Sequence, residues 1–261
     1  MGGCKRKGME FLKKLRIFNG NGLKLLAAAF MLIDHIGIML FPDVAWLRFI
    51  GRFSMPLFAF MIAEGCRYTK NKVKHFFLLF GLGVLCQIVY FIFDPSSLYL
   101  GILITFSIST LIIYALQYAK KCFFEKEAKT SRQLLSSGLV LALVALSFVL
   151  TRFILVDYGF WGIMMPVFAS IFDFHRIPAP DSLKKLDCLP IKVLCMMLAE
   201  VLLIVTHYEP LFQLPSLIAF ALLLLYNGEK GKANLKYFFY IFYPLHLALL
   251  EGVVFLLYLL T

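Results

Sequence analysis

Residues 23–41 read LKLLAAAFMLIDHIGIMLF, and this stretch decides the class of fold. Its apolar length is enough for one helix to cross the ~30 Å hydrocarbon core of a bilayer. No short apolar region followed by a cleavage site is present, so we expect a retained membrane span and not a signal peptide. Asp34 and His35 lie inside the stretch, so the sequence predicts a membrane helix that contains two ionisable groups.

The rest of the chain repeats this apolar pattern. We count nine candidate spans, at residues 23–41, 46–66, 73–93, 98–118, 134–155, 159–174, 190–207, 211–226 and 235–260. None of these runs alternates as the strands of a membrane β-barrel would. The sequence therefore predicts an all-α, polytopic membrane helix bundle of about nine transmembrane helices. Residues 1–22 are predicted to form a cytoplasmic amphipathic segment, and residues 23–261 a single transmembrane domain.

The composition excludes soluble and disordered proteins. Of 261 residues, 61% are hydrophobic and 16% are charged, and the mean hydropathy is +0.86. Soluble domains are about 45–50% apolar and about 25% charged. The six cysteines show no CxxC spacing and none lies in a predicted outer loop, so we expect neither a disulfide framework nor a metal site.

The net charge of +11 follows the positive-inside rule. Twenty-three of the 26 Lys and Arg residues precede or open the first run, or follow the second, fourth, sixth and eighth. The pattern places the N-terminus in the cytoplasm and the C-terminus outside, and it explains the basic excess without a nucleic-acid partner. The exceptions, Arg48, Arg52 and Arg152, lie near predicted outer helix ends, where we therefore look for function.

Several ionisable groups within the spans are predicted to share one layer. At ~1.5 Å per residue, His35 and His246 lie about 18 and 17 Å from the cytoplasmic starts of their helices, and Arg52 lies about 21 Å from the inside. Such groups cost at least ~2.5–3.5 kcal/mol each in a membrane, so they usually have a partner or a task. Asp34 points about 100° away from His35, so we expect it to pair with Arg52 or Arg48.

Other polar residues carry weaker signals. Glu64 lies near the cytoplasmic end of its run, where we expect a solvated face or an ion pair with Arg67 or Lys70. Glu200 and Glu251 lie in apolar runs with no motif around them. The three remaining histidines are expected to be solvated: His75, His175 and His207.

Two short loops add candidate site residues. Asp157-Tyr158-Gly159 is either a structural turn with a local ion pair to Arg152 or part of a site. Residues 226–232, YNGEKGK, form a turn whose backbone N–H groups and lysines suit an anion at a helix N-terminus.

Four blocks together resemble the TraX family. They are LKLLAAAFMLIDHIG from Leu23, GRFSMPLFAFMIAEGCRYTKN from Gly51, DYGFWGI from Asp157 and LYNGEKGKANLKYFFYIFYPLHL from Leu225. The namesake of the family acetylates the N-terminus of F-type pilin at the bacterial inner membrane. The family is also distantly similar to membrane acyltransferases that include heparan-α-glucosaminide N-acetyltransferase. This chain departs from the family pattern at Cys66 and Tyr68, where an aromatic residue and a histidine are expected.

The resemblance implies a multi-pass acetyltransferase of the bacterial cytoplasmic (inner) membrane. Cytoplasmic acetyl-CoA would be the acyl donor, with no metal, and the acceptor would be an amine or hydroxyl at the outer side: a peptide N-terminus, an amino sugar or a glycan. Membrane lipids would surround the protein. We expect catalytic residues (His35, Asp34, Arg52), substrate-binding residues (Glu64, Asp157, Tyr158, Tyr243, His246) and residues that bind the donor (Asn227, Gly228, Lys230, Lys232). The resemblance marks all of these except Lys230 and Lys232, which the basic turn adds.

The residue types suggest roles within that reaction. A buried imidazole is neutral at neutral pH, so His35 is the expected general base. Arg52 and Tyr243 are candidate donors to the thioester carbonyl, with His246 supporting His35 or facing the acceptor.

Two other functions remain open. In a transporter or flippase, Asp34, His35, Arg52 and His246 would form a proton relay or substrate site. The nine runs show no internal repeat and no matched pair of broken helices, which disfavours that class. The third alternative is a structural or assembly factor without enzymatic activity.

Overall fold

The computed structural model describes residues 16–93, 99–125, 129–207 and 209–260. Within these residues the chain is helical and has no strand beyond two isolated β-bridges. The helices are α2 (Gly20–Met39), α3 (Ala45–Gly51), α4 (Ser54–Tyr68), α5 (Lys72–Phe93), α6 (Ile102–Phe124), α7 (Thr130–Phe153), α8 (Gly159–Ala169), α9 (Asp181–Lys184), α10 (Leu189–Thr206), α11 (Pro210–Gln213), the 3-10 helix η1 (Leu214–Leu217), α12 (Ile218–Leu224) and α13 (Lys236–Leu260). The predicted all-α class is confirmed. Most of the predicted amphipathic segment, residues 1–15, lies outside the described residues.

Within the described residues, seven helical spans are long and apolar enough to cross a membrane. The runs predicted at 159–174 and 211–226 form shorter apolar helices, Gly159–Ala169 and Pro210–Leu224. The first ends because the chain turns after Ala169, and the second is divided into α11, η1 and α12, with prolines at the starts of α11 and η1. Every predicted run is helical, but the structure supports seven full spans and leaves the count of nine unconfirmed.

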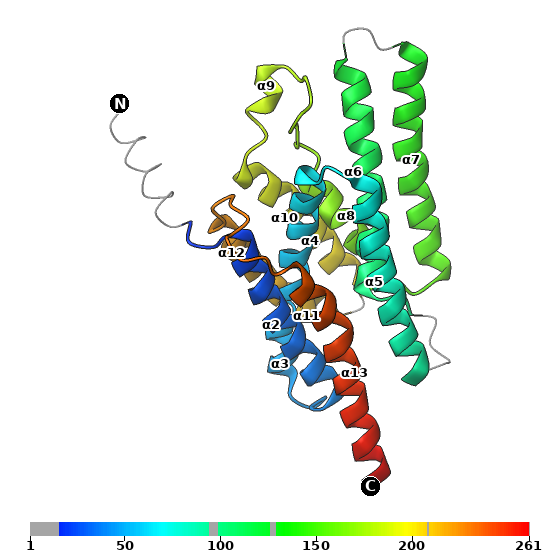
Figure 1. Cartoon of the computed structure of the whole chain (residues 1–261), viewed down its shortest axis with the longest axis vertical. Helices are drawn as coiled ribbons and strands as arrows, with labels where there is room; N and C mark the ends of the chain where they lie inside the picture. The colour runs from blue at the N-terminus through cyan, green and yellow to red at the C-terminus, as the bar shows by residue number, and fades with distance from the viewer. Residues whose placement is uncertain (1–15, 94–98, 126–128, 208, 261) are drawn as a thin grey trace.

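The helices run side by side, so their links gather at two ends (Figure 1). The link that follows α8, which carries Arg176, Lys184 and Lys185, lies toward the upper end of the view. The α2–α3 link and the C-terminus lie at the lower end. We name the upper end the basic end, because its links carry Lys and Arg, whereas the α2–α3 link at the lower end carries neither, as the charge pattern predicts. Which end faces the cytoplasm stays a prediction.

Helix α4 occupies the centre of the bundle. It packs against α2, α6, α8 and α12, and Leu57 and Phe60 on it are fully buried or nearly so. Helices α5 and α7 instead expose large apolar side chains such as Ile92 and Leu141. Outward apolar faces of this kind suit lipid contact.

A break separates α3 from α4 inside one predicted span. Pro56 has no N–H, so it cannot form the helical hydrogen bond to the carbonyl of Arg52. Beside the break, α2 and α3 pack so closely that a Cβ on Gly51 would overlap the side chain of Asp34. The glycine therefore allows Arg48 on α3 and Arg52, which directly follows α3, to reach Asp34 on α2.

Buried ion pairs fasten the link between α8 and α10 to α4. Arg67 Nη1 lies 2.5 Å from Asp173 and 2.6 Å from Asp187, and Lys192 Nζ lies 3.1 Å from Asp187. Burial opposes ionisation of Asp187, but the hydrogen bonds from Arg67 and the backbone, with the charge of Lys192, outweigh it and lower its pKa. Glu64 joins this network through Lys192 at 3.6 Å, so the expected pairing with Arg67 or Lys70 is wrong. Lys192 of α10, which is distant in sequence, pairs with Glu64 instead.

Candidate functional site

Two histidines from opposite ends of the chain form a hydrogen-bonded pair. His35 Nδ1 lies 2.9 Å from His246 Nε2, and His246 Nδ1 lies 2.8 Å from the carbonyl oxygen of Phe242. A carbonyl can only accept, so His246 carries its hydrogen on Nδ1 and, when neutral, accepts at Nε2. His35 must then donate from Nδ1, which leaves a lone pair on Nε2. The predicted shared depth of these imidazoles is confirmed, and their pairing defines which nitrogen of His35 is basic.

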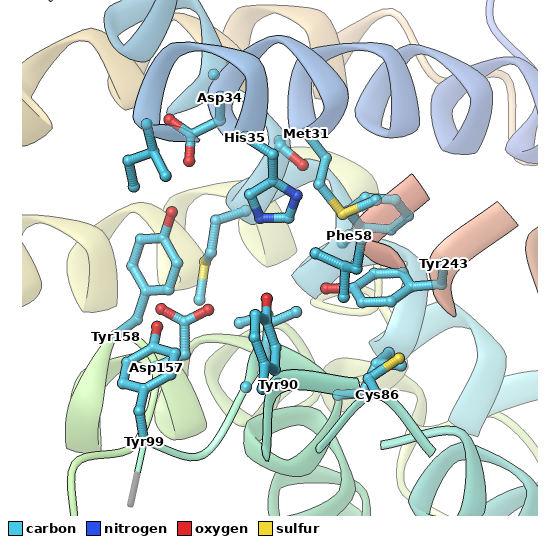
Figure 2. A pocket seen from close by; sticks show the side chains of 18 of the residues that line it. Met31, Asp34, His35, Phe58, Cys86, Tyr90, Tyr99, Asp157, Tyr158 and Tyr243 are labelled. Carbon is cyan, nitrogen blue, oxygen red and sulfur yellow. The ribbon is translucent and has the colours of Figure 1, made fainter. Parts of the chain in front are cut away.

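His35 faces a cavity of about 430 Å³, named here the His35 cavity. Figure 2 shows its imidazole pointing into this space, with Asp157 and Tyr158 on one side and Tyr243 on the other. His246 does not line the cavity and lies behind His35. No described residue donates a hydrogen bond to His35 Nε2, so this nitrogen is available to a bound molecule.

Two arginines and one acid form the charged wall of the His35 cavity. Asp34 Oδ1 lies 3.5 Å from Arg52 Nη2 and 4.0 Å from Arg48 Nε, which confirms the predicted pairing. The ring of Phe212 packs against both guanidinium groups, at 4.8 Å from Arg48 and 5.2 Å from Arg52. Arg52 is 8% exposed, and its Nε has no hydrogen-bond partner among the described residues. A ligand oxygen in the cavity would satisfy such a donor.

The loop before α8 supplies Asp157 and Tyr158. Tyr158 has φ +58°, a conformation that non-glycine residues rarely adopt and that clusters at functional sites. Its hydroxyl accepts a hydrogen bond from Arg52 Nη1 at 3.2 Å. Burial raises the pKa of Asp157 to about 6, although Tyr99 hydrogen-bonds to its carboxylate. The alternative ion pair to Arg152 is absent from the described structure, because that guanidinium lies over Phe148 at 4.7 Å.

A second cavity, of about 760 Å³, lies toward the basic end of the bundle. We name it the lysine cavity, because Lys24, Lys74 and Lys230 line it together with apolar side chains of α5 and α13. His75 also lines it, and its Nδ1 lies 2.7 Å from the hydroxyl of Tyr114. The expectation of a solvated His75 is therefore wrong, because α6 supplies a partner that the local sequence does not reveal. Glu64 lines this cavity and not the His35 cavity.

The loop at 226–232 packs on the start of α2. The N–H groups of Gly20 and Asn21 donate to the carbonyls of Glu229 and Lys230, at 2.7 and 3.0 Å. The first N–H groups of α2 are thus used by the loop itself. Gly228 and Lys230 line the lysine cavity, whereas Asn227 and Lys232 do not. The structure therefore brings only two of the four predicted donor-binding residues to that cavity.

The two cavities adjoin at three side chains that line both: Phe58, Leu103 and Tyr243. On each helix that lines both cavities, the residues of the lysine cavity lie nearer the basic end. On α2, for example, Lys24 lines the lysine cavity and His35 the other. The cavities are therefore arranged in series along the bundle.

Glu200 was only a weak candidate in the sequence. It is 1% exposed, and its Oε1 is hydrogen-bonded with Ser216 Oγ. Ser216 Oγ also lies 2.6 Å from the carbonyl oxygen of Gln213. A carboxylate within an apolar run is the sole sequence signal for Glu200, and it does not reveal Ser216 on η1 or Gln213 on α11. Glu251, the other acid without a motif, lines the His35 cavity.

No cluster of three or more His, Cys, Asp or Glu side chains within the described ranges is arranged to hold a metal ion.

Comparison with known proteins places the chain in a family. The family profile described as TraX protein matches residues 19–254. The probable fimbrial assembly protein FimC, serogroup H1, of Dichelobacter nodosus is 28% identical over 253 residues, which cover 89% of this chain and 94% of that protein. The uncharacterized protein RP591 of Rickettsia prowazekii (strain Madrid E) is 35% identical over 102 residues, 39% of each chain. No solved structure matches. Since the profile covers nearly the whole chain, this membrane helix bundle belongs to the TraX family.

Proposed function

We propose that this protein is a membrane acetyltransferase of the bacterial inner membrane. It takes an acetyl group from acetyl-CoA at the cytoplasmic side and transfers it to an amine or hydroxyl at the outer side. The observation that carries the proposal is the serial arrangement of a lysine-lined cavity and a cavity with a basic imidazole. A donor with a phosphate-rich end and a reactive thioester end fits such a path.

The lysine cavity suits the nucleotide end of the donor. Lys24, Lys74 and Lys230 come from three separate elements and place positive charge around one space. Apolar side chains such as Leu79 and Phe239 line the same cavity and suit the uncharged arm of CoA. In this proposal the thioester reaches the level of Tyr243, beside the His35 cavity.

His35 then acts as the general base. The acceptor nitrogen or oxygen attacks the thioester carbonyl carbon while His35 Nε2 removes its proton. The bond between carbon and sulfur breaks, and the thiolate of CoA takes the proton from His35. Arg52, with an unpartnered Nε–H, stabilises the negative charge that develops on the carbonyl oxygen. His246 keeps the basic lone pair of His35 on Nε2.

A peptide N-terminus is the acceptor that we favour. The relative from Dichelobacter nodosus is named a probable fimbrial assembly protein, and from this name we infer that the acceptor is the N-terminal amine of a protein subunit. Asp157 in the His35 cavity would attract an amine, which arrives largely as an ammonium ion and must release one proton to water before its nitrogen can attack. Transport through the same serial cavities is the competing function.

Labelled acetyl-CoA tests the proposal. Purified protein in vesicles, given radiolabelled acetyl-CoA at its basic face and membrane extract of the host, should release CoA and label a component of the extract. Addition at the opposite face should give neither product. Absence of CoA release with the donor at either face would contradict an acetyltransferase and favour the transporter.

Two neighbouring lysines provide a matched pair for the donor site. Lys230→Ala should raise KM for acetyl-CoA with little change in kcat, because a contact far from the carbonyl contributes uniform binding. Lys232→Ala removes the same charge two residues away, outside the lysine cavity, and should change KM less. Equal effects of the two variants would show that only overall charge matters.

A further inference from the structure

We propose that Phe58, Leu103 and Tyr243 form a partition that limits the transferred acyl group to a short chain. This inference rests on the proposed function, since it concerns the group that passes from the lysine cavity to the His35 cavity. These three side chains line both cavities, so they mark the level at which the acyl group meets the acceptor.

The partition is built from side chains on three helices of the bundle. Phe58 comes from the central helix α4, Leu103 from the first turn of α6 and Tyr243 from α13. The ring of Tyr243 lies edge-on to His246, with ring centroids 5.5 Å apart. The partition is therefore adjacent to the histidine pair, where the transferred carbonyl must lie.

Two of the helices next to the partition, α5 and α6, are already in close contact. Gly83 on α5 packs so closely on α6 that a Cβ there would lie 2.7 Å from Ile104 Cδ1 and 3.3 Å from the Ile104 backbone nitrogen. Ile104 is the neighbour of Leu103, so this contact holds the first turn of α6 against α5. Because packed helices do not yield to extra methylene groups without strain, the space at the partition is set by its side chains.

The space on the acceptor side is also limited. The His35 cavity, of about 430 Å³, must hold the acyl group and the reacting end of the acceptor at the same time. The added methylene groups of a longer acyl chain would compete with the acceptor for the space next to Phe58, Leu103 and Tyr243. One methylene changes discrimination in an apolar pocket by about 10–200-fold, so these residues are expected to favour acetyl over longer groups.

Acyl-CoA donors of increasing length test the partition. Acetyl-, butanoyl- and hexanoyl-CoA, each labelled in the acyl group, are given to the protein in vesicles with host membrane extract, and kcat/KM is measured for each donor. We expect the wild type to prefer acetyl over hexanoyl by about 10-fold or more. Tyr243→Ala should lower this ratio by about 10-fold, and Leu103→Ala should lower it independently on a different helix.

Two control variants separate the effect of side-chain volume from effects on the reaction and on folding. Tyr243→Phe keeps the ring, so it should keep the donor ratio even if loss of the hydroxyl slows transfer. Ile241→Ala truncates an exposed side chain on the same helix and should change neither the ratio nor the rate.

The outcomes distinguish failure of the partition from failure of the proposed acetyltransferase function. A lower ratio in Tyr243→Ala and Leu103→Ala, but not in Ile241→Ala, supports the partition. Normal acetyl transfer with an unchanged ratio in both partition variants overturns the partition and leaves the acetyltransferase standing. If the wild type and Ile241→Ala transfer no acyl group from any donor, the proposed function fails, and the partition fails with it.

Discussion

At the scale of single residues, the basicity of His35 depends on a backbone carbonyl of another helix. Phe242 accepts the hydrogen of His246, and His246 in turn accepts the hydrogen of His35. The order of these hydrogen bonds directs the lone pair of His35 into the cavity. His35 is therefore the catalytic residue of the proposed reaction, and His246 is a positioning residue.

Substitution of the two histidines should separate these roles. His35→Ala should reduce acetyl transfer by about 10²–10⁴-fold, since this is the contribution of a general base, and His35→Gln should be as inactive because an amide cannot take the proton. His246→Gln should retain more activity, since its amide oxygen can still accept from His35 Nδ1. The measurement is kcat/KM for acetyl-CoA, with thermal unfolding in detergent as the check of folding. Wild-type transfer by His35→Ala together with loss in His246→Gln would place the base on α13.

The single hydrogen of Ser216 can go to Glu200 or to the backbone of Gln213, and the second arrangement requires a protonated Glu200. The serine has one hydrogen and lies within hydrogen-bond reach of two acceptor atoms, on Glu200 and on the backbone of Gln213. If the serine donates to the carbonyl, Glu200 must donate to the serine, and so Glu200 must be a neutral carboxylic acid. No described cation lies within ion-pair distance of Glu200, which agrees with a neutral acid.

A neutral Glu200 should tolerate replacement by glutamine. Glu200→Gln keeps a donor to Ser216 and should change the free energy of unfolding by less than about 1 kcal/mol, whereas Glu200→Ala should cost about 1–3 kcal/mol. Infrared spectra of the wild type should contain the carbonyl band of a protonated carboxylic acid, and Glu200→Gln should lack it. A wild type without this band, combined with an unstable Glu200→Gln, would mean that Glu200 is ionised.

At the scale of elements, the charged wall of the site depends on the contact between α2 and α3. The short helix α3 ends at Gly51, and the missing Cβ lets its backbone lie against Asp34. The same contact brings Arg48 and Arg52 to one acid. A larger residue at this position would push α3 away from α2 and separate these charges.

Gly51→Ala should therefore be destabilising. Its methyl group would overlap Asp34, and overpacking of this kind costs about 1–3 kcal/mol. Gly138→Ala is the matched control, because a Cβ on that α7 glycine meets no atom within 4 Å. The control should be neutral or stabilising by about 0.5–1 kcal/mol, as expected for alanine in a helix interior. Thermal unfolding of both variants in detergent measures the difference, and equal stability would show that α3 moves without cost.

At the scale of the whole molecule, the bundle has one end rich in Lys and Arg and one end with few of them. The links that carry most of the Lys and Arg lie together in Figure 1, and the lysine cavity lies on the same side of the partition. The positive-inside rule assigns this end to the cytoplasm. The site of donor entry and the direction of transfer both depend on that assignment.

Cysteine labelling in intact cells tests the orientation. Single cysteines in place of Lys184 or Lys230 should react only after the membrane is made permeable, whereas those in place of Asp43 or Glu209 should react with an impermeant reagent added outside. All four positions are exposed, so each can be labelled. The native cysteines are replaced first, and the protein without cysteine serves as the background. Labelling of Lys184→Cys from outside would contradict the predicted orientation or the predicted number of spans.

The sequence by itself determined the class of fold and the residue types of the site. Apolar runs of spanning length specify helices in lipid, because backbone groups must be satisfied within each segment. Burying a charge in a membrane is costly, and this cost identified four candidates: Asp34, His35, Arg52 and His246. The rise per residue of a helix predicted that they lie at one depth. These inferences hold because they depend on local spacing and on the membrane as solvent.

Only the tertiary structure decided which of these residues meet. The pairing of His35 with His246 joins helices that are more than 200 residues apart in the chain, and no local periodicity encodes such a contact. The same limit explains why Lys192 and not Arg67 pairs with Glu64. The sequence also could not separate Lys230 from Lys232 or reveal the two adjoining cavities. Cavities and partners are properties of packing between helices, and packing is decided by the sum of many distant contacts.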